Sequence, residues 1–395
     1  MVSDFYIPII VMLLIIGAML REDFVFTILY LFIGAYALGR WWSRRALSSV
    51  DSERKLQPRA FLGEEIKVEL EFSNASWLPV VWLRVHEALP VELAVPNFFK
   101  QVISLSPHEH CRFEYRLQAR KRGYYPIGPL SMYSGDILGL TDQAKIEMPP
   151  KYVTVFPKIV PLNNVIVPSR SPMGSLRHHE PILEDPNRVR GKREYVAGDS
   201  LRQVDWKSTA ATGRLQVKLF EPSISLVTSI FLNLNAEDYH YKTRAPTVEL
   251  AIVVAASLAN WVVDKKQSVG LITNGKDPLG GEGDVQHLLP HNGRSHLMRL
   301  LETFARIEMV DDAPVPDHLR REIHHLPWGT TLVVITGRLD DQMFEALFHA
   351  RRLGINIMLV LCGPVQDFQT VKRRAEHFGF PVYQMFNEQD LDVWR

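Results

Sequence analysis

The stretch from Arg193 to Glu221 groups acidic, basic and aromatic residues that could form a catalytic or binding site. It reads REYVAGDSLRQVDWKSTAATGRLQVKLFE and places two carboxylates, Asp199 and Asp205, among several cations. A carboxylate beside Gly198 could act as a general acid or base. Hydrolysis would also call for a Ser/His/Asp, Cys/His or clustered metal-ligand arrangement, and the sequence offers none that supports it. The Gly198-Asp199 pair most simply predicts a turn.

Three interpretations of this stretch stay open from the sequence. In a structural one, Asp199 and Asp205 pair with Arg193 and Arg202, and Trp206 fills a gap in a core. In the second, the stretch is a docking surface for a partner. In the third, it holds a catalytic acid.

Cysteines and histidines do not form a recognisable site. Cys111 and Cys362 lie far apart and are expected to be lone buried thiols, which suits a reducing compartment. His287, His291 and His296 lack cysteine or acidic neighbours at metal-ligand spacing and are expected to be solvated.

The bulk composition limits the partners and the number of domains. A chain of 395 residues suggests roughly two to three domains, and its hydrophobic content of 46% allows sizeable cores. The formal net charge is +1, which argues against nucleic acid as the main partner.

Two apolar runs open the chain. Phe5–Leu20 contains no charge, and Phe24–Leu38 follows after Arg21-Glu22-Asp23. A membrane span needs about 20 mostly apolar residues, so the two runs predict a tight transmembrane hairpin. A buried helical hairpin is the alternative. A cleaved signal peptide is disfavoured, because Asp4 precedes the first run and no Lys or Arg does.

The positive charges predict the orientation of this hairpin. Six cations follow the second run, whereas the turn holds only Arg21, offset by two acids. The positive-inside rule then predicts a two-pass protein of the inner membrane with the bulk of the chain in the cytoplasm. The cluster is most simply a stop-transfer signal, and it could also contact anionic headgroups. Its members are Arg40, Arg44, Arg45, Arg54, Lys55 and Arg59.

The segment after the hairpin has the pattern of an all-β domain. Glu65–Phe72, Val80–His86 and Cys111–Ala119 alternate polar and apolar residues, as half-buried strands do. Several short strands predict an antiparallel β-sandwich. The expected parts are a hairpin with a basic segment over 1–50, the sandwich over 55–156, a proline-containing connector over 157–190, and the charged stretch with an α/β domain over 191–395.

The last part alternates apolar strands with helices, which predicts an α/β fold with a parallel, doubly wound sheet. Val248–Val263 is expected to be a helix covering this sheet rather than a membrane span, because its apolar core is short and contains Asn260. The predicted strands are Leu226–Leu234, Ser268–Thr273, Thr330–Thr336, Ile355–Leu361 and Val382–Met385.

This order of parts resembles the domain-of-unknown-function-58 family, whose last domain is similar to a von Willebrand factor type A fold. In the charged stretch, the residues that carry the resemblance are Arg193, Tyr195, Gly198, Asp199, Arg202, Asp205, Trp206, Lys207, Lys218, Phe220 and Glu221. In the β-domain they are Arg122-Gly123-Tyr124 with Gly128-Pro129, and Asp136 with Gly139-Leu140.

The resemblance implies a function through partners. Bacterial and archaeal members of the family are linked to MoxR-type AAA+ ATPases and are thought to act with them in assembling or maturing other proteins. The chain is therefore expected to be a non-enzymatic, membrane-anchored interaction or assembly factor with no cofactor and no evident small-molecule substrate. The alternatives are an extracytoplasmic adhesion-type receptor and a hydrolase that uses Asp199 and Asp205.

The resemblance also implies where a metal would bind. Type A domains often carry an Asp-x-Ser-x-Ser turn after the first strand, whose oxygen ligands suit Mg²⁺. Here the turn residues are Asn233, Asn235 and Glu237, and Arg338 follows a neighbouring strand. Losing the first charge and adding a cation predicts a degenerate, metal-free turn. A non-standard site stays open through Glu237, Asp238 and Asp340.

Overall fold

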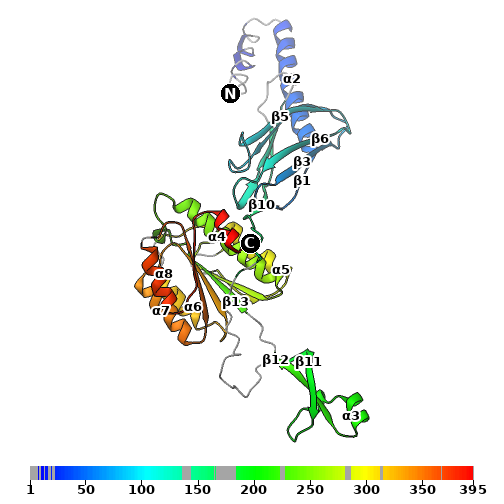
Figure 1. Ribbon diagram of the computed structural model, residues 1–395. Coiled ribbons are helices and arrows are strands. Elements are labelled where there is room, and N and C mark those ends of the chain that lie inside the picture. The colour runs from blue at the N-terminus through cyan, green and yellow to red at the C-terminus, as the bar shows by residue number, and fades with distance from the viewer. Residues whose placement is uncertain are drawn as a thin grey trace. The chain divides into compact units, whose positions relative to one another are not determined.

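The computed structural model in Figure 1 describes residues 8, 10–12, 14–16, 19, 23–135, 144–163, 165, 184–222, 227–280, 286–311, 315–365 and 367–394, without the side chains of 184–190, 220–222 and 286. Half of the first apolar run, Arg21-Glu22, most of the connector, and Asp136, Gly139 and Leu140 lie outside the described residues. The chain divides into two compact units, Met1–Lys158 with Leu301–Arg306, and Ile159–Leu300 with Ile307–Arg395.

The second apolar run lies in one long helix, α2 (Asp23–Ser48). Two helices of the described residues, α2 and α4 (Arg244–Asp264), are long and apolar enough to cross a membrane. Only 6% of the apolar window of α2 is buried in the protein, against 78% for α4. The sequence-based prediction that the α4 segment covers a sheet is therefore confirmed, whereas most of the apolar window of α2 is not buried in the protein.

The C-terminal turn of α2 is part of the β-domain, the name used here for Val50–Phe156. Ala46 and Leu47 are buried in one cluster with side chains of β3, β4 and β8. The indole Nε1 of Trp42 donates a hydrogen bond to the Pro79 carbonyl at 3.2 Å. This packing joins the helix rigidly to the domain that follows.

Three sheets build the β-domain, with the orders β1-β3-β6, β5-β4-β8-β9 and β2-β10-β7. One buried cluster joins side chains of the first sheet to the second, and another joins the first to the third. The strands are β1 (Val50–Leu56), β2 (Arg59–Phe61), β3 (Glu65–Asn74), β4 (Val80–Ala88), β5 (Phe98–Leu105), β6 (His110–Gln118), β7 (Gly123–Ile127), β8 (Leu130–Ser134), β9 (Ala144–Met148) and β10 (Lys151–Phe156).

Three details differ from the sequence-based expectation. β2 and β10 pair in parallel, so the domain is not wholly antiparallel. β1 begins at Val50, whereas the domain was predicted to start at residue 55. Most of its side chains are charged, so the sequence gives little sign of a strand there. The strand β11 (Glu184–Glu194) begins inside the segment interpreted as a connector.

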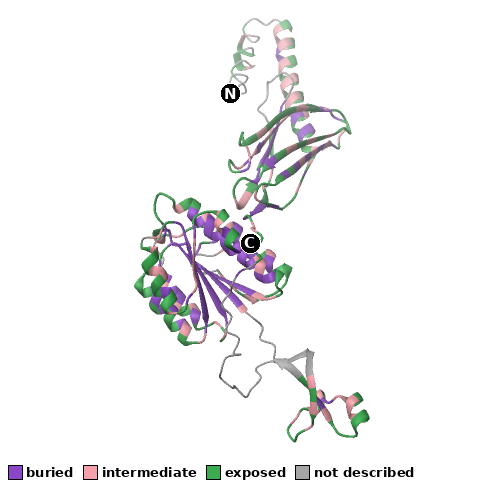
Figure 2. Ribbon diagram, in the orientation of Figure 1, coloured by how far each residue is buried: buried purple, intermediate pink, exposed green. Residues whose placement is uncertain are grey.

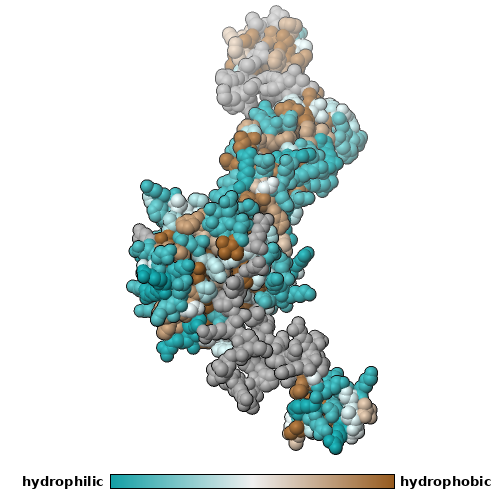
Figure 3. Space-filling model, viewed as in Figure 1, coloured by the Kyte–Doolittle hydropathy of each residue, from teal (hydrophilic) through white to brown (hydrophobic). Residues whose placement is uncertain are grey.

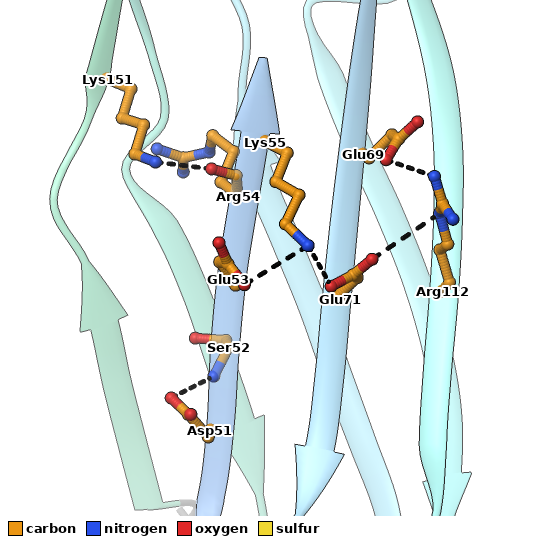
Figure 4. Close-up of polar contacts among 9 residues, drawn as sticks. All are labelled: Asp51, Ser52, Glu53, Arg54, Lys55, Glu69, Glu71, Arg112 and Lys151. Atoms are coloured by element: carbon orange, nitrogen blue, oxygen red, sulfur yellow. Dashed lines mark hydrogen bonds and ion pairs between the residues drawn. The ribbon is translucent and has the colours of Figure 1, made fainter.

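The outer face of the β1-β3-β6 sheet is covered by ion pairs, as Figure 4 shows. The Lys55 ammonium lies 2.7 Å from Glu71 and 3.6 Å from Glu53, and the Arg112 guanidinium pairs with Glu69. Cross-strand pairs of this kind support the register of adjacent strands. Lys55 therefore belongs to the folded β-domain rather than to a basic segment free to contact a membrane.

A six-stranded sheet forms the centre of the second unit, in the order β15-β14-β13-β16-β17-β18. All its pairs are parallel except β14 with β15. Figure 1 shows α4 on one face and α6, α7 and α8 on the other, and Figure 2 shows the central strands buried. The elements are β13 (Val227–Leu232), β14 (Ser268–Thr273), β15 (Gln286–His291), α5 (Arg294–Arg306), α6 (Val315–Ile323), β16 (Thr331–Thr336), α7 (Asp341–Arg352), β17 (Asn356–Cys362), α8 (Phe368–His377) and β18 (Val382–Met385).

The predicted strands and the doubly wound arrangement are present, but β15 and α6 were not predicted from the sequence. β15 is an edge strand containing Pro290 and two histidines, so it lacks an apolar run. In α6 the buried Val315, Leu319 and Ile323 recur every four residues, a helical signal that its short length makes weak.

The charged stretch forms a separate β-hairpin module. β11 pairs in antiparallel fashion with β12 (Gln216–Pro222), for example Arg193 opposite Val217. Between the strands lie the short 3₁₀ helix η1 (Leu201–Gln203) and the helix α3 (Trp206–Thr212). These elements are called the hairpin module below.

Candidate functional site

At the turn of the hairpin module, Arg193 holds Asp199 with two parallel hydrogen bonds. Its Nη1 lies 2.7 Å from Asp199 Oδ2 and its Nη2 lies 2.6 Å from Oδ1. The Val196 amide also donates to this carboxylate at 2.9 Å. The Arg193 contact, with the Val196 amide, lowers the pKa of Asp199. Gly198 has a φ of +113° in the turn, so the predicted turn is confirmed and requires glycine there.

Asp205 has two structural roles, as a helix cap and in an ion pair. Its side chain accepts hydrogen bonds from the backbone amides of Lys207 at 3.1 Å and Ser208 at 3.3 Å, which makes it the N-cap of α3. The Lys192 ammonium lies 2.7 Å from its Oδ2. The Lys192 hydrogen bond, followed by that of the Ser208 amide, lowers the pKa of Asp205 to about 2.

The expected partner of Asp205 was therefore wrong. Lys192 takes the place assigned to Arg202, because the Asp205 amide donates to the Gln216 carbonyl at 2.8 Å. That bond holds Asp205 beside the paired strands, where Lys192 lies. Pairing of Asp199 with Arg193 is present as expected.

The apolar side chains of the hairpin module remain largely in solvent. Trp206 is 67% exposed, Leu201 64% and Val196 60%. Trp206 does not fill a core gap, because it begins α3 on its solvent side. Figure 3 shows hydrophobic spots next to hydrophilic surface on this module. Arg202 and Lys207 are also exposed, and Tyr195 is half-buried.

The double role of Asp205 predicts a pH-dependent α3. Because the folded pKa of about 2 lies below the ordinary aspartate pKa of 3.8, the stabilising effect of Asp205 is present above pH 3.8 and is lost as the pH falls toward 2. Asp205→Ala should remove the cap and speed amide exchange in α3 by roughly fivefold at neutral pH. Hydrogen exchange on the full chain measures this. Asp205→Asn retains a capping oxygen and should exchange more slowly than the alanine variant; equal rates in all three proteins would contradict the cap.

A second cluster of polar residues lies at the carboxyl end of the central sheet. β13 has neighbours β14 and β16 on its two sides, so this is the switch point where α/β sheets place their ligands. Asn233 follows β13 and is 1% exposed. Its Nδ2 donates to Asp238 Oδ2 at 2.8 Å and to Thr336 Oγ1 at 2.9 Å.

The side-chain oxygen of Asn233 also has two hydrogen-bond partners. Its Oδ1 accepts from the Asn235 amide at 2.9 Å and from Asn274 Nδ2 at 3.0 Å. A backbone amide can only donate, so the orientation of the Asn233 side chain follows from its partners. Both N–H groups of the Asn233 side chain donate and its oxygen accepts two hydrogen bonds, so the side chain has no capacity for a further ligand.

These residues do not fit a divalent cation. Where a metal would sit between Asp238 and Thr336, an amide NH₂ points at both oxygens, and Asn235 Nδ2 donates to the same Asp238 oxygen at 3.2 Å. Glu237 is exposed, and Asp340 caps α7 through the Met343 amide at 2.7 Å. Over the part of the chain that the structure describes, no three His, Cys, Asp or Glu side chains form a group suited to a metal.

Close packing also shuts this edge of the sheet. The Tyr239 hydroxyl donates to the Asn233 carbonyl at 2.5 Å from a fully buried position. A Cβ on Gly337 would collide with the Asp238 carbonyl and the Tyr239 ring. Arg338 is exposed to solvent. The group that lies between Asp238 and Thr336, where a cation would bind, is therefore the Asn233 amide and not the Arg338 guanidinium.

Comparison with known proteins finds a family model that matches part of the chain. Residues 191–353 match the family described as "Protein of unknown function DUF58". The resemblance based on the charged stretch is thus confirmed over that range, which covers most of the hairpin module and the α/β domain as far as α7. The "Uncharacterized protein YeaD" of Bacillus subtilis (strain 168) is 23% identical over 331 residues, which cover 76% of this chain and 79% of that protein.

Solved structures give weaker similarities. A von Willebrand factor type A protein from Catenulispora acidiphila is 9% identical, covers 45% of this chain and 42% of its own, and has a TM-score of 0.30. The CARDB domain of the PF1109 protein from Pyrococcus furiosus is 14% identical, with coverage of 27% and 86% and a TM-score of 0.20.

Two contributors to these sites and one buried histidine were not predicted from the sequence. Lys192 and Asn274 were not singled out, although Asn274 directly follows β14 at the same sheet edge as Asn233. His296 was expected to be solvated but is 3% exposed, and its Nε2 lies 2.8 Å from the Val269 carbonyl. Burial lowers the pKa of His296.

Proposed function

We propose that this chain is a non-enzymatic protein-interaction or assembly factor, anchored in the inner membrane by two helices, with its bulk in the cytoplasm. Its docking surface is the hairpin module. One observation carries the proposal: Asp199 and Asp205 are bound by partners within the module, while Trp206, Leu201 and Val196 face solvent.

The exposed groups have the chemistry of a binding site. Tryptophan and arginine are enriched among the residues that contribute most to protein–protein binding. Trp206 and Arg202 lie close in sequence on a module whose fold is held by Arg193–Asp199 and Lys192–Asp205. Such pre-formed geometry reduces the entropy lost on binding.

The same contacts argue against the hydrolase alternative. A general acid at neutral pH needs a raised pKa, and partners lower the pKa of both Asp199 and Asp205. At the sheet edge, the position where a type A fold would bind a metal is filled by the Asn233 amide. The adhesion-type alternative commonly depends on such a metal, so the amide weighs against it as well.

The resemblance to the DUF58 family supplies the proposed partner, a MoxR-type AAA+ ATPase. It also supplies the finer architecture of the proposal, a β-sandwich followed by a von Willebrand factor A-like domain. The hairpin module precedes that last domain, and most of it lies within the matched residues 191–353.

Co-purification from solubilised membranes tests this function. The full-length chain should retain the MoxR-type ATPase of the same organism, and Trp206→Ala with Leu201→Ala should reduce the retained amount by at least roughly tenfold, the effect expected of a binding hot spot. Trp328→Ala is the matched control, because Trp328 is 65% exposed on another part of the chain. Equal retention by all three proteins would refute docking at the hairpin module.

A further inference from the structure

The six cations that follow the second apolar run separate into two groups in the structure. Arg54 is buried against Glu87, Lys55 pairs with Glu71, and Arg59 pairs with Glu302. In contrast, no carboxylate of the described residues pairs with Arg40, Arg44 or Arg45 of α2. The sequence treated these cations as one cluster, but only the arginines of α2 are available to a ligand.

The three arginines border a hollow on α2 of about 660 Å³. Arg40 and Arg44 are one helical turn apart, as are Trp41 and Arg45, so four side chains point to adjoining parts of the helix surface. Arg44 and Arg45 are exposed and Arg40 is half-buried. The lining residues are Tyr36, Ala37, Arg40, Trp41, Arg44, Arg45 and Ser48.

The helix places this hollow at the depth of lipid headgroups. The apolar run ends at Leu38, and a rise of about 1.5 Å per residue puts Arg40 to Arg45 about 3–10 Å beyond it. Headgroups occupy about 5–8 Å on each side of the hydrocarbon core. Trp41, which is 53% exposed, has the amphipathic ring typical of this layer.

We propose that Arg40, Arg44 and Arg45 form a binding site for the phosphate headgroup of an anionic phospholipid. This inference rests on the proposed membrane anchorage through α2. Guanidinium groups bind phosphate oxygens with paired, charge-assisted hydrogen bonds. Because Ala46 and Leu47 fix the end of α2 in the β-domain core, the bound lipid would set the height of that domain at the membrane.

Lipid retention in nanodiscs tests the site on the full-length chain. The discs contain phosphatidylcholine with a minor share of phosphatidylglycerol, and native mass spectrometry counts the lipids that remain on the released protein. The wild-type chain should retain phosphatidylglycerol in preference to phosphatidylcholine. Each Arg→Gln substitution in Arg40, Arg44 and Arg45 should reduce this preference by roughly fivefold.

Two further variants distinguish a specific lipid site from an effect of overall positive charge. A triple Arg→Gln variant in Arg112, Arg116 and Arg120 of the β-domain removes the same charge from exposed positions and should keep the preference. Arg→Lys at the three α2 positions should lose part of it, because lysine cannot form the bidentate contact. An unchanged preference in the α2 Arg→Gln triple variant, or equal loss in the β-domain variant, would overturn the proposal.

The same experiment distinguishes its possible failures. A chain that does not stay in the discs would refute the membrane anchorage itself. A chain that stays inserted without preferring phosphatidylglycerol would refute the lipid site alone. Added inorganic phosphate should leave the retained lipid in place; displacement by phosphate would indicate a site for a free anion and contradict the lipid site.

Discussion

Replacing Glu87 by alanine is expected to lower the free energy of unfolding of the β-domain by about 3–5 kcal/mol. The Arg54 and Glu87 side chains are fully buried, with Nη2 and Oε1 2.6 Å apart. The Tyr115 hydroxyl donates to the other Glu87 oxygen at 2.5 Å, and Arg54 Nη1 donates to the Pro149 carbonyl at 3.0 Å. Removing the carboxylate leaves an unpaired guanidinium in the core, which is the origin of the large cost.

Amide hydrogen exchange of β3 and β6 in the full chain measures this loss. Lys55→Ala is the control, because Lys55 is the neighbour of Arg54 on β1 and its ion pair is in solvent, where pairs contribute little. The double variant Arg54→Met with Glu87→Leu should recover most of the stability, since it leaves no buried charge. If Glu87→Ala costs no more than Lys55→Ala, the buried pair does not stabilise the domain as described.

Asn233→Asp is expected to lower the free energy of unfolding of the α/β domain by about 3–5 kcal/mol at neutral pH. The substitution replaces a donor by an acceptor 2.8 Å from the Asp238 carboxylate and removes the hydrogen bond to Thr336. Two carboxylates would then face each other in a buried site, which raises the pKa of the new group. The destabilisation should therefore be absent at low pH and grow as the pH rises above about 4.

Thermal unfolding across this pH range, with and without Mg²⁺, measures the effect. Mg²⁺ should restore part of the lost stability, because the substitution gives the site the carboxylate pair that a hard cation needs. Asn260→Asp is the control: the Asn260 amide donates to Asp264 at 3.0 Å, but this pair is exposed on α4 and should matter little. An Asn233→Asp chain as stable as wild type at neutral pH would contradict the account of this site.

Much of the α/β fold could be predicted because its signals are local. Strands such as Thr331–Thr336 and Asn356–Cys362 are fully buried, so they read as continuous apolar runs in the sequence. β1 gave no such signal, because four of its seven residues are charged. Its inward Arg54 depends on Glu87, which lies in a different sheet and leaves no trace in local spacing.

The sites were less predictable, because their partners are set by tertiary contacts. Arg193 near the end of β11 and Asp199 in the following turn are only six residues apart, so their pairing could be predicted. The Lys192–Asp205 pair depends on the register of β11 with β12, and the exposure of Trp206 depends on which side of α3 meets the strands. At the sheet edge, the sequence predicted a degenerate metal turn but not the partners of Asn233. They come from the segment after β13, from the end of β16 and from the residue after β14.

Photocrosslinking from position 206 tests the central proposal, docking through the hairpin module, most directly. The full-length chain would carry benzoylphenylalanine in place of Trp206 in one strain and in place of Trp328 in another, both exposed aromatic positions. Irradiation of intact cells should give a crosslink to the MoxR-type ATPase from position 206 and none from position 328. Crosslinks of equal yield from both positions, or no ATPase adduct at position 206, would contradict docking through the hairpin module.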